Sequence, residues 1–206
     1  MIREALLFVL DVLNQYIPPL NNASMDDLIV LGNIAMVDAY NDSANDGLEN
    51  RIIVSVVNIE EEPVFRNAPS VVRGTGVNAR ELAPPVFMNV YILFAANNTK
   101  YENALHYISR VIGFFQNNKV FRSDGRFVMP DGGILTPNEA FPLGVEKMIF
   151  DLYSMNFEQL NQLWSIMGGK YVPSVVFKVR MLPIQESVGK AASIVCAIES
   201  EEKVGG

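Results

Sequence analysis

The chain has 206 residues, of which 50% are hydrophobic and 19% are charged, and its formal net charge is -7. This composition excludes an intrinsically disordered chain and predicts one folded domain. The apolar stretch Ala5–Leu10 is followed by Asp11 and is far shorter than the roughly 20 residues that cross a bilayer, so we predict neither a membrane span nor a signal peptide.

The distribution of charge and the single cysteine limit the class of protein further. Residues 1–62 carry two basic and eleven acidic side chains, whereas residues 63–130 carry eight basic and three acidic ones. This segregation suits packing between copies of a subunit or onto an oppositely charged neighbour, and charges solvated on separate faces are the alternative. The overall acidity disfavours nucleic-acid binding. Cys196 has no partner for an intramolecular disulfide, which indicates synthesis in a reducing cytoplasm.

The first quarter of the chain predicts one helix and one strand. Residues 2–16 are apolar around most of a helical circumference and are followed by Pro18 and Pro19, so the helix is expected to be buried and to end before them. The apolar stretch Leu28–Val37 is bounded by acidic and Asn-rich segments and is predicted to form a strand. The polar residues 40–50 are expected to form a loop.

Two central strands are predicted next, at Arg51–Glu60 and Val86–Ala96. The first is dense in β-branched residues and the second is almost continuously apolar, and both patterns are typical of buried strands. Between them, Glu61–Pro85 has four prolines and no regular apolar period. Connections of this length are usually functional or disordered rather than simple linkers. This one carries three arginines, Arg66, Arg73 and Arg80.

A second helix is predicted to begin near Thr99 and to end at Asn117–Asn118. Thr99 and Glu102 have the spacing of a capping box, in which each side chain bonds the backbone N–H of the other residue. Apolar residues then recur at helical spacing, at Tyr101, Leu105, Ile108, Ile112 and Phe115.

A third helix has equally clear signals at its two ends. Asn156 is the predicted N-cap, with Gln159 three residues later, and Gly168–Gly169 is the predicted stop. Its apolar positions are Phe157, Leu160, Leu163, Trp164 and Met167.

The second half of the chain also predicts three strands. Phe127–Met129 is a short candidate that leads into a turn at Pro130–Gly133, and Gly144–Tyr153 is a longer one. Between Pro173 and Pro183, apolar and mixed residues alternate with period 2, which indicates a strand with one wetter face.

The order of these elements predicts an α+β domain over residues 1–184, with a mixed or antiparallel sheet flanked by helices. Because the last strand is expected to end at Pro183, residues 185–206 are interpreted as an extended C-terminal arm. Within this arm, Ala192–Ile198 is apolar and strand-like, and the acidic run Glu199–Glu202 follows it.

No constellation of residues points to catalysis, a cofactor or a metal. His106 is the only histidine, and we interpret it as a surface or hydrogen-bonded histidine rather than a base, since a triad also needs a nucleophile and an orienting acid. One histidine and one cysteine do not make a structural zinc site. Gly74–Gly76 lacks the strand and helix of a dinucleotide loop, and Glu60–Glu62 is interpreted as a solvated strand end.

Four stretches together resemble the cap proteins of contractile injection systems of the antifeeding-prophage and virulence-cassette type. They are MIREALLFVLDVLNQYI at the start, VVNIEEEPVFRN from Val56, PPVFMNVYILFAANNTKYENALHYISRVIGFFQNNKVF from Pro84, and LNQLWSIMGGKYVPSVVFKVRML from Leu160. The resemblance covers residues 1 to about 185. These are packing and strand motifs, and it is their combination that is specific.

The resemblance implies a tail terminator, or cap: a structural subunit, not an enzyme, that forms a six-fold ring on the last sheath and tube layers and ends their polymerisation. The implied partners are other copies of the chain in a homo-hexameric ring and the sheath and inner-tube proteins, without nucleic acid, cofactor or direct membrane span. It also implies cytoplasmic synthesis and assembly into a phage-tail-like particle, either released or anchored in its cell.

Two segments are candidate arms that reach neighbouring subunits. We expect Ala192–Ile198 to add a strand to the sheet edge of an adjacent ring or sheath subunit, through Ile194, Val195 and Ile198. We expect the arginines at 66, 73 and 80 to contact acidic surfaces such as the first 62 residues of the next copy. A solvated tail and a mobile loop are the alternatives.

Other functions remain open from the sequence alone. A cap adaptor, or another ring at the tail end, needs the same scaffold as a terminator. An enzyme with an unrecognised carboxylate pair is opposed by the lack of a nucleophile, base and phosphate loop. A stand-alone ligand-binding module predicts a monomer with a concave apolar pocket, whereas a terminator predicts a ring.

Overall fold

The structure is a computed structural model. It describes most of the chain, and its described residues are 1–20, 27–36, 48–63, 71–73, 80–82, 84–129, 131–137, 139–168, 170–184 and 190–191. Within these residues, no helix is long and apolar enough to span a membrane.

A six-stranded sheet is the centre of the fold, with strand order β1-β2-β5-β10-β9-β6. The β1 and β2 strands are parallel, and the other neighbours in the sheet are antiparallel. The predicted α+β class and mixed sheet are therefore confirmed. The strands are β1 (Ile29–Leu31), β2 (Arg51–Glu61), β5 (Val86–Asn97), β6 (Val120–Arg122), β9 (Lys147–Tyr153) and β10 (Ser174–Ile184).

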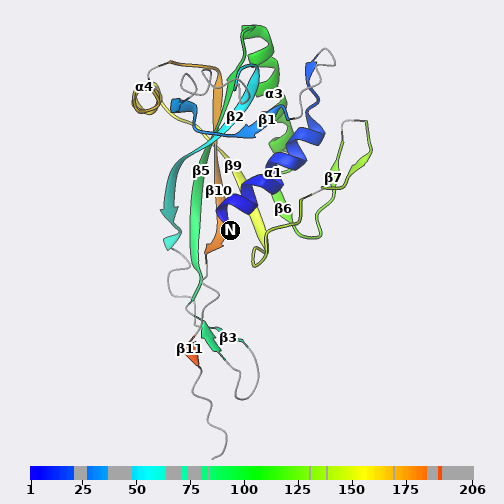
Figure 1. Ribbon diagram of the computed structural model, residues 1–206, viewed down its shortest axis with the longest axis vertical. Helices are drawn as coiled ribbons and strands as arrows, with labels where there is room; N and C mark the ends of the chain where they lie inside the picture. The colour runs from blue at the N-terminus through cyan, green and yellow to red at the C-terminus, as the bar shows by residue number, and fades with distance from the viewer. Residues whose placement is uncertain are drawn as a thin grey trace, which may run out of the picture.

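Helices cover both faces of this sheet (Figure 1). On one face lie α1 (Ile2–Tyr16) and α3 (Tyr101–Asn117), and their buried residues share a hydrophobic cluster with β2, β5, β9 and β10. On the other face, α4 (Phe157–Ile166) and the 3-10 helix η2 (Ile34–Met36) pack through a smaller cluster around Trp164. The two faces are called the α1 face and the α4 face below.

Phenylalanines from five elements fill the core of the α1 face. The ring of Phe115 in α3 lies 4.6 Å from Phe150 and 4.5 Å from Phe177, measured between centroids. Phe121 lies 4.8 Å from Phe150, and Phe94 contacts both Phe115 and Phe177. Aromatic rings bury large apolar areas and add a specific contact energy, so this cluster fixes α3 against β5, β9 and β10.

The strand predicted at Leu28–Val37 is shorter than expected. It is limited to β1, and the chain then forms η2. The Ser55 hydroxyl explains the change, because it donates to the carbonyl of Gly32 at 2.6 Å and accepts the backbone N–H of Ile34 at 3.1 Å. These side-chain bonds replace the ladder bonds that a longer β1 would need. Residue 37 lies outside the described residues.

Of the two predicted helix caps, one forms and one does not. At α4, the Asn156 side chain accepts the N–H of Gln159 at 2.8 Å, and the Gln159 side chain accepts the N–H of Asn156 at 3.0 Å. Helix α3 has the predicted span, but its N-cap is Lys100, without a side-chain cap bond. The box predicted at Thr99 is therefore wrong, because the helix starts one residue later than the motif requires.

Two strand boundaries also differ from the prediction. The strand expected from Gly144 begins at Lys147, because Pro142–Val145 form a turn in which Gly144 has φ 78°. The strand β10 continues through Pro183 to Ile184, one residue beyond the predicted end at the proline. Its neighbour β9 pairs only as far as Arg180, so the proline lies where β10 has one neighbour, and a missing N–H is tolerated there.

Short strands complete the structure. The strand predicted at Phe127–Met129 is β7 (Phe127–Val128), which pairs with β8 (Ile134–Leu135) around the predicted turn. Within the long connection after β2, β3 (Val71–Arg73) and β4 (Arg80–Leu82) pair with each other, and β11 (Lys190–Ala191) pairs with β4. Figure 1 shows β3 and β11 beyond the end of the main sheet where β10 ends. The sequence pattern did not predict β6, β8 or this small sheet.

Candidate interaction surfaces

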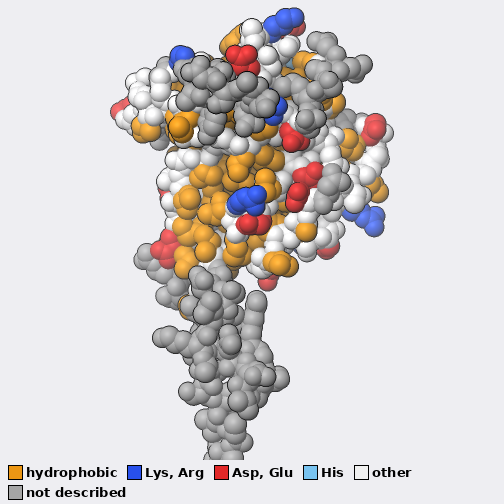
Figure 2. Space-filling model, viewed as in Figure 1, with side chains coloured by type: hydrophobic (Ala, Val, Ile, Leu, Met, Phe, Trp, Pro, Cys, Tyr) orange, Lys and Arg blue, Asp and Glu red, His pale blue; other side chains and the backbone are white. Residues whose placement is uncertain are grey.

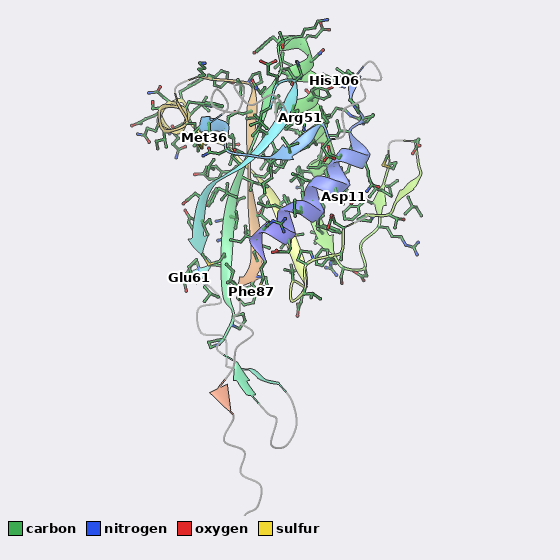
Figure 3. The ribbon with its side chains drawn as sticks, in the orientation of Figure 1. Asp11, Met36, Arg51, Glu61, Phe87 and His106 are labelled. Carbon is green, nitrogen blue, oxygen red and sulfur yellow. The ribbon has the colours of Figure 1, made fainter. Side chains whose placement is uncertain are left out.

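The described residues do not bring together a catalytic or metal-binding group. His106 is exposed on α3, beside the ring of Tyr107, and Figure 3 shows it at the end of the domain opposite Glu61 and Phe87. Among the described residues, no three side chains of His, Cys, Asp or Glu are placed to hold a metal ion. The surfaces of the described residues are therefore treated as candidate sites of contact.

The outer edge of β2 is the first such surface. The β1 strand pairs with β2 only at Ile52–Val54, followed by one more bond from the N–H of Gly32 to the carbonyl of Val54. From Val56 to Glu60, β2 pairs with β5 on its inner side, and no described strand lies on its outer side. An unpaired strand edge offers backbone N–H and carbonyl groups to another chain.

An apolar groove of about 660 Å³ lies beside this edge, with residues of both α1 and α4 in its lining. It is lined by Ile2, Leu6, Leu31, Val56 and Ile166, with Arg3 at its margin. Ile166 is 77% exposed, and Leu31 and Val56 are each more than one third exposed. Figure 2 shows hydrophobic side chains gathered on this side of the molecule, between α4 and the end of the sheet. Exposed apolar side chains gathered in this way make the groove a candidate contact site.

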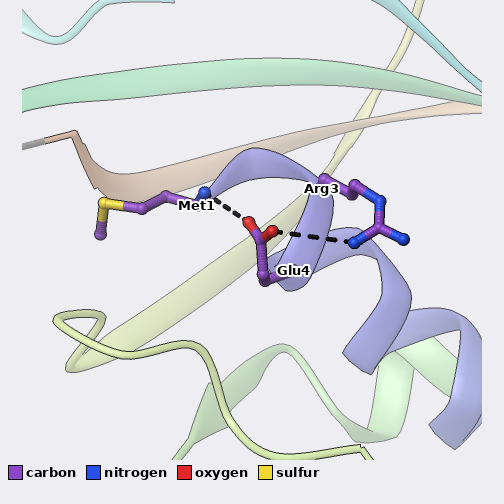
Figure 4. Close-up of polar contacts among 3 residues, drawn as sticks. All are labelled: Met1, Arg3 and Glu4. Carbon is purple, nitrogen blue, oxygen red and sulfur yellow. Dashed lines mark ion pairs between the residues drawn. The ribbon is translucent and has the colours of Figure 1, made fainter.

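A small charged group lies at the start of α1, next to the groove. The carboxylate of Glu4 contacts the amino group of Met1 and lies 3.9 Å from the Arg3 guanidinium (Figure 4). The hydrogen bond from the Met1 amino group lowers the pKa of Glu4. Arg3 is exposed, and among the described residues its one ion pair is this long contact with Glu4. Its charge is therefore available to a partner.

Toward the Glu60 end of β2, the opposite, α4 face of the same strands is polar. The Tyr91 hydroxyl donates to Glu60 at 3.0 Å, and the ammonium group of Lys178 lies 5.3 Å from the Tyr91 ring centroid. The Asn89 amide donates to Glu62 at 2.9 Å. Burial raises the pKa of Tyr91, and Glu60 adds to this effect while the bond with Lys178 opposes it. The sheet therefore presents an apolar face on one side of β2 and a hydrogen-bonded, charged face on the other.

The structure describes only part of the predicted interaction residues. Arg73 and Arg80 are register partners in the β3–β4 pair. Arg66, Ile194, Val195 and Ile198 lie outside the described residues.

The sequence did not single out the β2 edge, because Arg51–Glu60 was interpreted as central over its whole length. The exposed half was signalled only by the acidic run at Glu60–Glu62, which follows Ile59 directly.

Comparison with known proteins identifies the family. A match to the Pvc16 N-terminal domain family extends over residues 7–195. This chain belongs to that family. The expected relationship to injection-system cap proteins is confirmed at this level, whereas a comparison with curated proteins gives no match.

Two solved structures share the fold of this Pvc16 N-terminal domain. One is the sheath/tube terminator, in the extended state, of the extracellular contractile injection system PVC, with TM-score 0.61, 18% identity and coverage of 100% of this chain and 64% of that one. The other is the anti-feeding prophage cap, a tube-terminating cap, with TM-score 0.56, 19% identity and coverage of 97% and 59%. The tail-terminator-like fold is thus confirmed, and this chain spans less than two thirds of either protein.

Proposed function

We propose that this chain is a structural terminator subunit of a contractile injection system, which forms a hexameric ring and ends sheath and tube polymerisation. The observation that carries the proposal is the family match over residues 7–195, together with a fold shared with a sheath/tube terminator and a tube-terminating cap. Because fold alone does not determine function, the surfaces of this chain provide the second support.

Those surfaces suit a subunit that works by contact. A ring needs head-to-tail contacts between two different patches on each subunit. The described part of the chain offers an unpaired β2 edge with an apolar groove beside it. It also has apolar residues on the outer side of α3, where Tyr101, Leu105 and Ile112 are exposed. The proposed partners are other copies of the chain and the sheath and inner-tube proteins of one particle, which is assembled in the cytoplasm and then released or anchored.

Two arms are proposed to reach those partners. Arg73 and Arg80 occupy partnered register positions in β3 and β4. This pairing supports an acidic partner for the arginines, including Arg66, on the first 62 residues of the next copy. The second arm is the segment after β11, whose apolar residues Ile194, Val195 and Ile198 suit strand addition.

The proposal is tested by electron microscopy of particles from cells that lack this gene. We expect sheaths that are over-long, ragged or absent, and restoration of normal length when the full chain is supplied. Particles of normal length with closed ends would contradict a terminator. A cap adaptor, the alternative within the same machine, predicts normal sheath and tube length with loss only of what attaches beyond the cap.

The arms have a separate test in the same cells. A chain truncated after Ala191 keeps β10 and β11, so we expect it to fold and yet to restore particle length poorly. Substitution of Arg66, Arg73 and Arg80 by Gln tests the other arm, with Arg122→Gln on the exposed edge strand β6 as the matched control. Full restoration of length by the truncated chain would contradict a role for the tail.

A further inference from the structure

The geometry points to a specific receptor for the C-terminal segment: residues 192–198 of one copy add a strand to the outer edge of β2, over Val56–Glu60, in a second copy. This inference rests on the proposed ring and names the surface through which neighbouring subunits are joined. Four features of the molecule lead to it: the open edge, the direction of the chain, the apolar pattern and the charges.

The edge is open over a length that matches the segment. Beyond Val54, no described strand lies on the outer side of β2, and the Ser55 hydroxyl directs the preceding chain into η2. A strand rises about 3.3 Å per residue, so a seven-residue segment such as Ala192–Ile198 is long enough to pair along Val56–Glu60. Such an added strand gains its affinity from backbone hydrogen bonds.

The direction of β11 favours a second copy over the segment's own subunit as the receptor. The strand β4 ends at Leu82 and is followed closely by β5, which begins at Val86, so β4 runs toward the main sheet. Since β11 is antiparallel to β4, it runs away from the main sheet. At Ala191 the described chain is thus directed away from its own main sheet, which favours a receptor on a second copy.

The apolar patterns of the two partners correspond. In an extended segment, alternate side chains share a face, so Ile194, Cys196 and Ile198 lie together. On β2, Val56 and Ile59 are opposite Ile92 and Val90, which both belong to the α1-face cluster. Val56 and Ile59 are 36% and 46% exposed. A strand docked here with its larger residues on the α1 face extends the apolar surface that also contains Ile2 and Leu31.

The charges select the antiparallel orientation. The exposed Glu60, whose carboxylate accepts from Asn58 and Tyr91, lies at one end of the open edge, and Arg3 lines the same groove as Val56, at the other end. The segment has Lys190 before it and Glu199–Glu202 after it. Antiparallel docking brings Lys190 to the Glu60 end and the acidic run to Arg3, whereas parallel docking would place carboxylates beside Glu60.

The single native cysteine provides a direct test. Cys196 lies within the segment, so Val56→Cys and Ile59→Cys each create one possible cross-link to the edge. We expect oxidation of purified particles, and of the purified full chain, to give disulfide-linked dimers and higher multimers, with a peptide containing position 56 or 59 bonded to one containing Cys196. The same variants carrying Cys196→Ser, and Leu152→Cys on the β9 strand, where residue 152 is 53% exposed, are the controls.

Each outcome of the test is decisive. Multimers that require Cys196 and one of the β2 cysteines support the inference. Disulfide-linked monomers would overturn the second copy as the donor, and equal cross-linking by Leu152→Cys would overturn β2 as the receptor. If particles have normal length and ends but both β2 variants stay uncross-linked, the docking inference fails while the terminator proposal stands. If loss of the gene leaves particle length unchanged, the proposed function itself fails.

Discussion

The Ser55 hydroxyl of β2 donates a hydrogen bond of 2.6 Å to the backbone carbonyl of Gly32. The same oxygen accepts the N–H of Ile34, so one side chain satisfies two backbone groups just after β1. Since buried backbone groups need partners, these two bonds allow the segment after β1 to turn away from β2 without leaving its backbone groups unpaired. The short β1 and the open β2 edge both follow from them.

Replacing Ser55 by Ala is expected to destabilise the domain by about 1–3 kcal/mol, because it leaves buried backbone groups without a partner. Denaturant unfolding measures the change. The control is Ser109→Ala, whose exposed hydroxyl donates to Leu105 on the surface of α3 and which should shift stability by no more than about 0.5 kcal/mol. Equal midpoints for the two variants would show that Ser55 does not support the η2 turn.

The two predicted caps should respond differently to mutation. Asn156→Ala removes a bond that the structure shows at the start of α4 and is expected to cost about 1 kcal/mol. Thr99→Ala should have almost no effect, because α3 begins without a side-chain cap bond. Thermal unfolding of both variants and of the parent chain measures the two losses of stability. A larger loss for Thr99→Ala would mean that the capping box forms after all.

The phenylalanine cluster should dominate stability. Phe115 is 2% exposed and its ring contacts Phe150 and Phe177, so Phe115→Ala is expected to cost about 3–5 kcal/mol through lost contacts and a cavity. Phe157→Ala is the matched control, since Phe157 is 92% exposed at the start of α4. Chemical denaturation should therefore separate two identical substitutions by several kcal/mol. Similar unfolding curves for Phe115→Ala and Phe157→Ala would show that the phenylalanine cluster does not dominate the stability of the domain.

Tyr91 should make stability depend on alkaline pH. Burial raises its pKa in the folded state above the ordinary value of 10.0, so the unfolded chain loses this proton first. The contribution of Tyr91 to the free energy of unfolding is constant below about pH 10. It decreases as the pH rises through the folded-state pKa. Unfolding measured from pH 8 to 11 should show a smaller alkaline loss for Tyr91→Phe than for the parent. Tyr101→Phe, at an exposed position, should behave like the parent.

Several elements could be predicted because their signals are local. The spacing of apolar residues in 2–16 and 101–117 is helical, and the β-branched run of Arg51–Glu60 is a strand in the structure. The same spacing did not distinguish buried from exposed positions on α3. Ile108 and Phe115 are buried, whereas Tyr101, Leu105 and Ile112 of the same apolar series are exposed, because only packing against the sheet selects the inner side of the helix.

The amino-acid sequence by itself determined the class of the fold, the three helices and the lack of a recognisable catalytic constellation, because periodicity, caps and residue inventory are properties of neighbouring residues. Only the tertiary structure decided the strand order, the early end of β1 at Leu31 and the resulting open edge of β2. These features depend on contacts such as that between Ser55 and Gly32, which are distant in sequence, and no local pattern specifies which residues such contacts will join.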